Sequence, residues 1–158
     1  MSLSDLCCRC VPRRDRRALL MLLLCYLPVA GQEAFGAEGR HFVMIVHRDN
    51  TVQSASQDFL RRAFLKTSTR WDDGEVLKPV DQRPSARVRV HFSKAVLGRT
   101  VAAVKNYWQQ RIFSGRGVPP PELASDEAVV RYVAAHRGAV GYVEEDTPLE
   151  GVTVLAVK

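Results

Sequence analysis

Residues 113–143, FSGRGVPPPELASDEAVVRYVAAHRGAVGYV, decide the fold of this 158-residue chain. They run from a glycine- and proline-rich loop into an amphipathic helix and then, after a glycine, into an apolar strand. Ser125 is a good N-cap, and the two acidic residues after it suit the positive end of the helix dipole. Gly138 predicts the helix end, and residues 139–143 have so little polar content that we expect a strand covered on both faces. The stretch therefore predicts half of an α/β unit.

The N-terminal residues have the pattern of a secretory signal peptide. Five arginines within residues 9–17 precede the apolar run 18–30, which is too short to span a bilayer comfortably as a helix. We expect residues 1–31 to be a signal peptide and residues 32–40 a loose lead-in. The alternatives are an uncleaved N-terminal membrane anchor and lipidation at Cys25. The expected location is periplasmic or secreted.

Cleavage changes the charge and the cysteine content of the chain. The formal net charge is +6, and residues 1–31 carry five arginines and two aspartates, so 18 basic and 15 acidic residues remain, a net +3. All four cysteines lie in residues 1–31, which excludes disulfides and thiolate metal sites from the remaining domain. So small a charge, with aromatics on apolar stripes, argues against nucleic-acid binding. We expect no cofactor and no metal.

Residues 41–158 predict a single small α/β domain, a mixed β-sheet flanked by about four helices. Residues 41–47, HFVMIVH, predict a central strand, and either Ser54 or Ser56 caps the helix that follows. Further strands are expected at 76–81, 139–143 and 152–157. Further helices are expected to begin after Thr100 and Ser125.

Residues 85–97 fit two structures. Apolar residues alternate with polar ones from Val88 to Phe92, as in a strand, but the apolar spacing also makes a helical stripe. Pro84 and Ser85 form a helix start signal and Gly98 a stop signal, so we favour a helix capped by Ser85.

The sequence lacks catalytic motifs but contains the residues of a candidate anion site. The chain after residue 31 has no cysteine nucleophile, no G-x-S-x-G and no H-E-x-x-H, so an enzyme, including an envelope hydrolase, is not expected. A helix N-terminus with a hydroxyl and nearby arginines can hold a phosphate-sized anion. The alternative is ordinary helix caps with solvated arginines. The candidate ligands are Arg83, Ser85, Arg87, Arg89, Ser54 and Ser56.

A series of short motifs covers nearly the whole chain after residue 41. Its members are Phe64-Leu65, Trp71-Asp72-Asp73-Gly74, Pro79-Val80-Asp81, Arg89 with Phe92, Val96-Leu97-Gly98, Tyr107-Trp108, Phe113-Ser114-Gly115, Pro119-Pro120 and residues 138–143. In this order they resemble the small secreted relatives of the phosphate-binding protein of ABC transporters, in the type II periplasmic-binding-protein superfamily.

The resemblance implies part of a type II periplasmic binding protein that binds phosphate or a similar oxyanion and works with an ABC transporter membrane complex. Full-length receptors hold phosphate with an arginine shortly before a Ser-Gly-Thr that caps a helix. Arg83 and Ser85 fall near those places, while Ala86 and Arg87 stand where Gly and Thr are expected. A second hypothesis is therefore a degenerate binding-protein domain that serves as a protein-interaction or sensory accessory without ligand.

Overall fold

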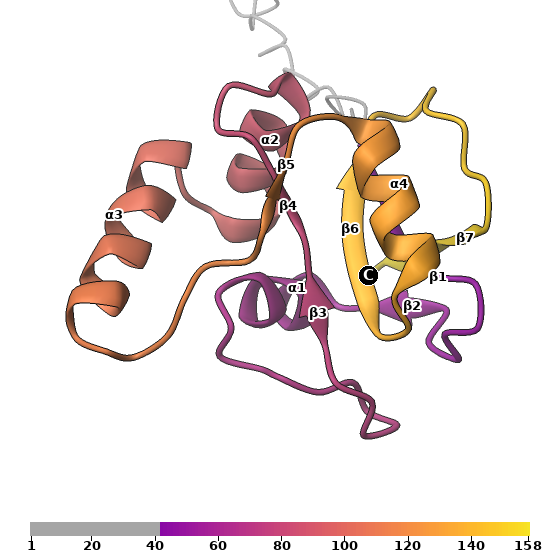
Figure 1. Cartoon of the computed structure of the whole chain (residues 1–158), viewed down its shortest axis with the longest axis horizontal. Helices are drawn as coiled ribbons and strands as arrows, with labels where there is room; N and C mark the ends of the chain where they lie inside the picture. Colours follow the sequence, from indigo (N-terminus) through magenta and orange to yellow (C-terminus); the bar gives the residue numbers. More distant parts are fainter. Residues whose placement is uncertain (1–41) are drawn as a thin grey trace, which may run out of the picture. The chain divides into compact units, whose positions relative to one another are not determined.

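The computed structural model describes residues 42–158, which form a mixed sheet with helices on its faces (Figure 1). This confirms the predicted α/β domain. The expected signal peptide, the lead-in at 32–40 and His41 lie outside the described residues.

The main sheet has the strand order β2-β7-β1-β6-β3. The central strand β1 runs antiparallel to both β6 and β7, whereas the short edge strands β2 and β3 run parallel to β7 and β6. The predicted central strand at 41–47 is confirmed from Val43 onward. The bounds are β1 Val43–His47, β2 Ser54–Ala55, β3 Lys78–Pro79, β6 Ala139–Val143 and β7 Val152–Val157.

The expected strand at 76–81 is divided in two. β3 pairs with β6, but β4 (Asp81–Gln82) forms a separate parallel pair with β5 (Glu122–Leu123). The Asp81 N–H donates to the Pro121 carbonyl at 2.9 Å, so the chain changes its partner strand directly after Val80. This change carries the chain away from the main sheet and into the turn at residues 83–86.

Three helices carry the predicted hydroxyl caps. The hydroxyls of Ser56, Thr100 and Ser125 each accept a bond from the N–H three residues on, at 3.1, 3.2 and 3.3 Å. Thr100 and Ser125 are thus confirmed, and Ser56 rather than Ser54 caps the first helix. These helices are α1 Gln57–Phe64, α3 Val101–Phe113 and α4 Asp126–Ala135.

The ambiguous residues 85–97 are helical, as α2 (Arg87–Phe92) followed by a π-helical segment, η1 (Ser93–Leu97). The prediction that Ser85 caps this helix is wrong. Ala86 is the N-cap residue and makes no side-chain capping bond. The reason is a turn in which the Ala86 N–H donates to the Arg83 carbonyl at 3.0 Å, so the helix begins after Ala86.

The core occupies both faces of the sheet. Alternation along β1 sends Met44 into an aromatic cluster with α1 and α2, and Ile45 into a smaller cluster with α4. In the first cluster the rings of Phe92 and Tyr142 are stacked, with centroids 3.8 Å apart. Every residue of β6 is buried, which confirms the prediction that this strand is covered on both faces. At Gly141 a Cβ would lie 2.6 Å from Val129 Cγ1, so glycine is what allows α4 to pack this closely.

Candidate functional site

The turn between β4 and α2 holds two of the predicted anion ligands, and a third lies on the first residue of α2. Arg83, Ser85 and Arg87 are all exposed there. Because the Ala86 side chain cannot accept a hydrogen bond, no side-chain cap satisfies the first N–H groups of α2. The Arg83 N–H donates to the Leu123 carbonyl at 3.0 Å, which fixes the turn against β5.

Arg89 lies in the core and not in this exposed turn. Its guanidinium forms an ion pair with Asp81, and the two side chains are 4% and 5% exposed. Nη1 also donates to the Tyr142 hydroxyl at 3.4 Å. Burial lowers the pKa of Arg89, because desolvation disfavours the charged form. Asp81 already neutralises its charge, so Arg89 has no free positive charge to offer a ligand.

The Arg89–Asp81 pair belongs to a buried polar network that joins four elements. The Tyr142 hydroxyl donates to Asp81 and accepts a bond from the Gln82 N–H at 3.3 Å. The Gln82 amide donates to the Tyr142 carbonyl at 3.0 Å and to Asp126, the first residue of α4. The network therefore ties α2, β4, β6 and α4 together and fixes the turn that carries Arg83 and Arg87.

The network gives stability a pH dependence in the alkaline range. Burial raises the pKa of Tyr142 above its ordinary value of 10.0, because the phenolate would lose its hydration. The neutral phenol contributes its full stabilisation below the pKa that Tyr142 has in the unfolded chain. This contribution decreases as pH rises above that pKa, since only the unfolded state then releases the proton. Above about pH 10, the free energy of unfolding should decrease by up to about 1.4 kcal/mol per pH unit from this group.

Tyr142→Phe removes the titrating group and serves as the comparison. Urea unfolding between about pH 8 and pH 11 should show a steeper loss of stability in the natural protein than in the Phe variant. Equal slopes in the two proteins would show that Tyr142 ionises with the same pKa in the folded and unfolded states.

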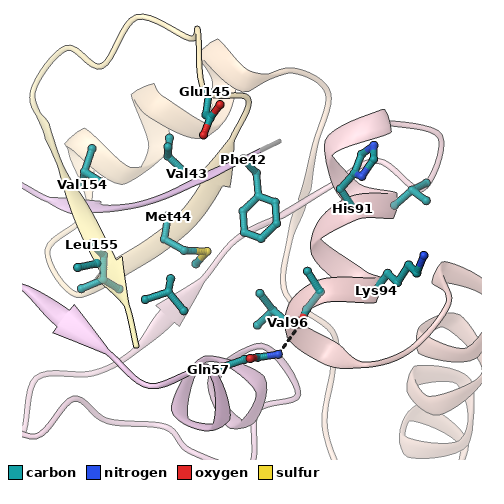
Figure 2. A pocket seen from close by; sticks show the side chains of 14 residues that line it. Phe42, Val43, Met44, Gln57, His91, Lys94, Val96, Glu145, Val154 and Leu155 are labelled. Atoms are coloured by element: carbon teal, nitrogen blue, oxygen red, sulfur yellow. Dashed lines mark hydrogen bonds between the residues drawn. The ribbon is translucent and has the colours of Figure 1, made fainter. Parts of the chain in front are cut away.

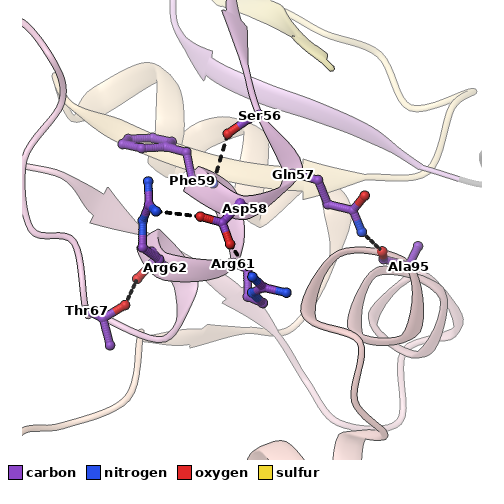
Figure 3. Close-up of polar contacts among 8 residues, drawn as sticks. All are labelled: Ser56, Gln57, Asp58, Phe59, Arg61, Arg62, Thr67 and Ala95. Carbon is purple, nitrogen blue, oxygen red and sulfur yellow. Dashed lines mark hydrogen bonds and ion pairs between the residues drawn. The ribbon is translucent and has the colours of Figure 1, made fainter.

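Ser54 and Ser56 do not join the turn before α2. Ser54 pairs with Ala156 in the sheet, and Ser56 caps α1. Next to Ser56, the Gln57 amide donates to the carbonyl of Ala95 in η1 (Figure 3). Ala95 is eight residues beyond Arg87, or about 12 Å along a helix axis. The two serines therefore lie near the opposite end of the α2–η1 helix.

Acidic residues lie next to Arg87, and sequence reasoning did not place them there. A polar hollow of ≈ 260 Å³ is lined by Arg87, His91, Glu144, Glu145 and Asp146. The three acidic residues directly follow β6, so the loop after this strand meets the first turn of α2. The sequence shows an acidic turn at this point but not which helix it meets. Among residues 42–158, no cluster of three or more potential ligand side chains is placed to hold a metal ion.

A larger hollow of ≈ 680 Å³ lies between the sheet and the α2–η1 helix. Figure 2 shows Met44, Val154 and Leu155 on the strand side and His91, Lys94 and Val96 on the helix side. His91 and Glu145 line both hollows, so the apolar hollow adjoins the polar one beside Arg87.

Comparison with known proteins gives matches by structure alone. No protein-family model matches the chain, and neither does any curated protein sequence. An ABC-type phosphate transport receptor from Vibrio cholerae matches with a TM-score of 0.57 and 16% identity over 74% of this chain and 46% of its own. A phosphate ABC transporter substrate-binding protein from Clostridium perfringens, solved with bound phosphate, matches with a TM-score of 0.57 and 14% identity over 74% of this chain and 44% of its own.

PstS from Borrelia burgdorferi also matches, with a TM-score of 0.57 and 9% identity over 75% of this chain and 47% of its own. This chain thus spans less than half the length of each of these solved chains. Within residues 42–158, none of the helices is long and apolar enough to cross a membrane. At such low identities the likeness shows the fold: the described domain has the architecture of one part of a phosphate-receptor-like periplasmic binding protein.

Proposed function

We propose that this protein is a solute-binding module that holds phosphate or a similar small oxyanion without covalent chemistry. The observation that carries the proposal is an uncapped helix N-terminus between two exposed arginines, Arg83 and Arg87, in a domain with the fold of phosphate receptors. Helix N–H groups and guanidinium groups are the donors that bind phosphate oxygens in proteins.

The proposed ligand shell is smaller than the set expected from sequence. It consists of Arg83, Arg87, the Ser85 hydroxyl and the first N–H groups of α2. Arg89 is assigned a structural role because Asp81 neutralises it in the core. Ser54 and Ser56 are left out because they lie near the far end of the α2–η1 helix. The same proposal includes a signal peptide, export to the periplasm or out of the cell, and work with an ABC transporter.

Weak binding follows from the surroundings of the site. Arg83, Ser85 and Arg87 are exposed, so water screens each charged contact with the anion. The carboxylates of Glu144, Glu145 and Asp146 line the hollow beside Arg87 and reduce the positive potential there. Affinity should therefore fall as ionic strength rises.

Calorimetry tests the proposal. Titration of the protein with inorganic phosphate and with sulfate, at low and at moderate salt, should give saturable binding in the millimolar range. Arg83→Ala with Arg87→Ala should weaken it at least about tenfold, because two charge-assisted hydrogen bonds are lost. Arg48 directly follows the last residue of β1, and its side chain is exposed. It is not one of the proposed ligands, so Arg48→Ala should leave affinity unchanged. No saturable binding of any anion at millimolar concentration would refute the proposal.

The carboxylates beside Arg87 favour a second candidate, an interaction or sensory domain that has lost its ligand. Those side chains repel an anion but could pair with a basic group of a partner protein. The two candidates differ in what their function needs. If a cellular phenotype of gene deletion is restored by the Arg83→Ala, Arg87→Ala variant but not by a Glu144→Gln, Glu145→Gln, Asp146→Asn variant, the interaction role is supported.

A further inference from the structure

Apolar side chains are exposed together at the end of α3. Phe113, the last residue of the helix, is 90% exposed, Ile112 is 50% exposed, and Val118 in the loop that follows is 64% exposed. We call residues 112–118 the α3 tip. It holds three of the six large apolar side chains that are exposed within residues 42–158. Such grouping indicates a contact with something outside the domain, whereas single exposed apolar residues are ordinary.

Hydrogen bonds hold the α3 tip in a defined shape. The Arg116 N–H donates to the Arg111 carbonyl at 2.8 Å, and the Arg111 guanidinium donates to the Arg116 carbonyl at 2.9 Å. That guanidinium also lies over the Trp108 ring, 5.9 Å from its centroid. Just after the α3 tip, the Lys66 amine donates to the Pro119 carbonyl at 3.3 Å. The loop is therefore bonded on both sides of Gly117 and presents its apolar side chains at the edge of the domain, away from β7 (Figure 1).

The charges around the α3 tip are all basic in the sequence. No Asp or Glu occurs from residue 82 to residue 121. Residues 99–118 carry four basic side chains, those of Arg99, Lys105, Arg111 and Arg116. None of the four takes part in an ion pair within residues 42–158, where the ion pairs are made by other basic residues. Lys105 and Arg116 are exposed, so their positive charge is available to a partner.

The form of the α3 tip favours a surface over a small ligand. Neither of the two hollows described above has a lining residue in the α3 tip, so its apolar side chains project outward and do not enclose a cavity. A protein partner would need a pocket shaped to receive Phe113. The boundary between lipid headgroups and acyl chains accepts apolar side chains of any shape and, where the headgroups are anionic, attracts lysine and arginine beside them.

We propose that the α3 tip binds the surface of an anionic phospholipid bilayer. Ile112, Phe113 and Val118 enter the boundary between headgroups and acyl chains. Lys105 and Arg116 bind the headgroup phosphates. The contact is peripheral, because it attaches the domain to the bilayer surface and needs no membrane-spanning helix. It does not depend on the proposed anion site, since none of the proposed phosphate ligands lies on α3 or in the α3 tip.

Depth-dependent fluorescence quenching tests this contact in the full chain. Phe113→Trp introduces an indole at an exposed position, so the fold should be kept. Vesicles of equal parts phosphatidylglycerol and phosphatidylcholine, with bromine atoms on the acyl chains, should quench the emission that this indole adds at least about twofold. The two tryptophans of the natural chain, Trp71 and Trp108, are 3% and 6% exposed, so the natural protein should show little quenching under the same conditions.

Charge reversal tests the role of the basic side chains. Lys105→Glu and Arg116→Glu together, in the Phe113→Trp background, should reduce the quenching at limiting lipid at least about tenfold, because each reversal replaces attraction by repulsion. Brominated phosphatidylcholine alone should quench the Phe113→Trp protein as weakly. Residues 1–31 also carry arginines and an apolar run, but they are the same in every variant, so a difference between variants reports on the α3 tip.

Val154→Trp is the matched control, because Val154 is 49% exposed on β7, at the other side of the domain from α3 (Figure 1). The indole introduced there should not be quenched. No quenching of Phe113→Trp by anionic vesicles would overturn the proposal and favour a protein partner instead. Equal quenching of the two indoles, or quenching that the charge reversals leave unchanged, would also overturn it, because the α3 tip would then not be the part that recognises the bilayer.

Discussion

Arg89→Met is expected to lower the free energy of unfolding by about 3–5 kcal/mol, because it leaves the buried Asp81 carboxylate without its counter-ion. The Tyr142 hydroxyl and the Gln82 N–H still donate to the Asp81 carboxylate, but neither donor carries a charge. Urea unfolding at neutral pH measures the loss.

Two further variants make this result specific to the ion pair. Arg87→Met alters an exposed arginine two residues earlier on the same helix and should change stability by no more than about 0.5 kcal/mol. Adding Asp81→Asn to Arg89→Met should restore part of the loss, since the unpaired charge disappears. A double variant as unstable as the sum of the two single ones would show that Arg89 and Asp81 are not energetically coupled.

Gly138→Ala is expected to cost about 2–5 kcal/mol, through backbone strain and a steric clash together. Gly138 has φ +76°, and a Cβ there would lie 2.2 Å from the Val76 carbonyl oxygen. The Gly138 carbonyl accepts bonds from the Trp71 indole at 2.9 Å and from the Lys78 N–H at 3.0 Å. A shift of the backbone to relieve the clash would weaken both bonds at the start of β6.

Gly98→Ala is the matched control. Gly98 also has a left-handed backbone, with φ +63°, but a Cβ there would meet nothing within 4 Å. The free energy of unfolding of Gly98→Ala, measured in urea, should fall only by the backbone strain, about 1–2 kcal/mol. Equal losses at the two positions would mean that the close approach at Gly138 relaxes without cost.

Local signals in the sequence predicted much of the fold. The hydroxyls of Ser125 and Thr100 act through bonds to N–H groups three residues on, and Gly138 acts through its own left-handed backbone, so the helix caps and the buried strand 139–143 could be predicted. The division of the strand at 76–81 could not, because it depends on a bond from Asp81 to Pro121, forty residues away. Nor does any local signal show that Ala86 rather than Ser85 is the cap.

Tertiary contacts, which local sequence signals do not show, also decide which residues belong to the candidate site. Arg87 and Arg89 look alike in the sequence, yet Arg87 is exposed and Arg89 is buried against Asp81. The difference arises from tertiary contacts with β4 and β6, which spacing on a helix does not reveal. The meeting of the acidic residues after β6 with Arg87 is likewise a result of how β6 and α2 pack.

The most direct test of anion binding before α2 is a phosphate titration followed by the backbone amide signals of the protein in NMR. We expect saturable chemical-shift changes that centre on the amides of Arg87 and Val88 and on the turn before them, and that disappear when Arg83 and Arg87 are both alanine. No saturable changes, or changes centred on Ser54 and Ser56 instead, would contradict it.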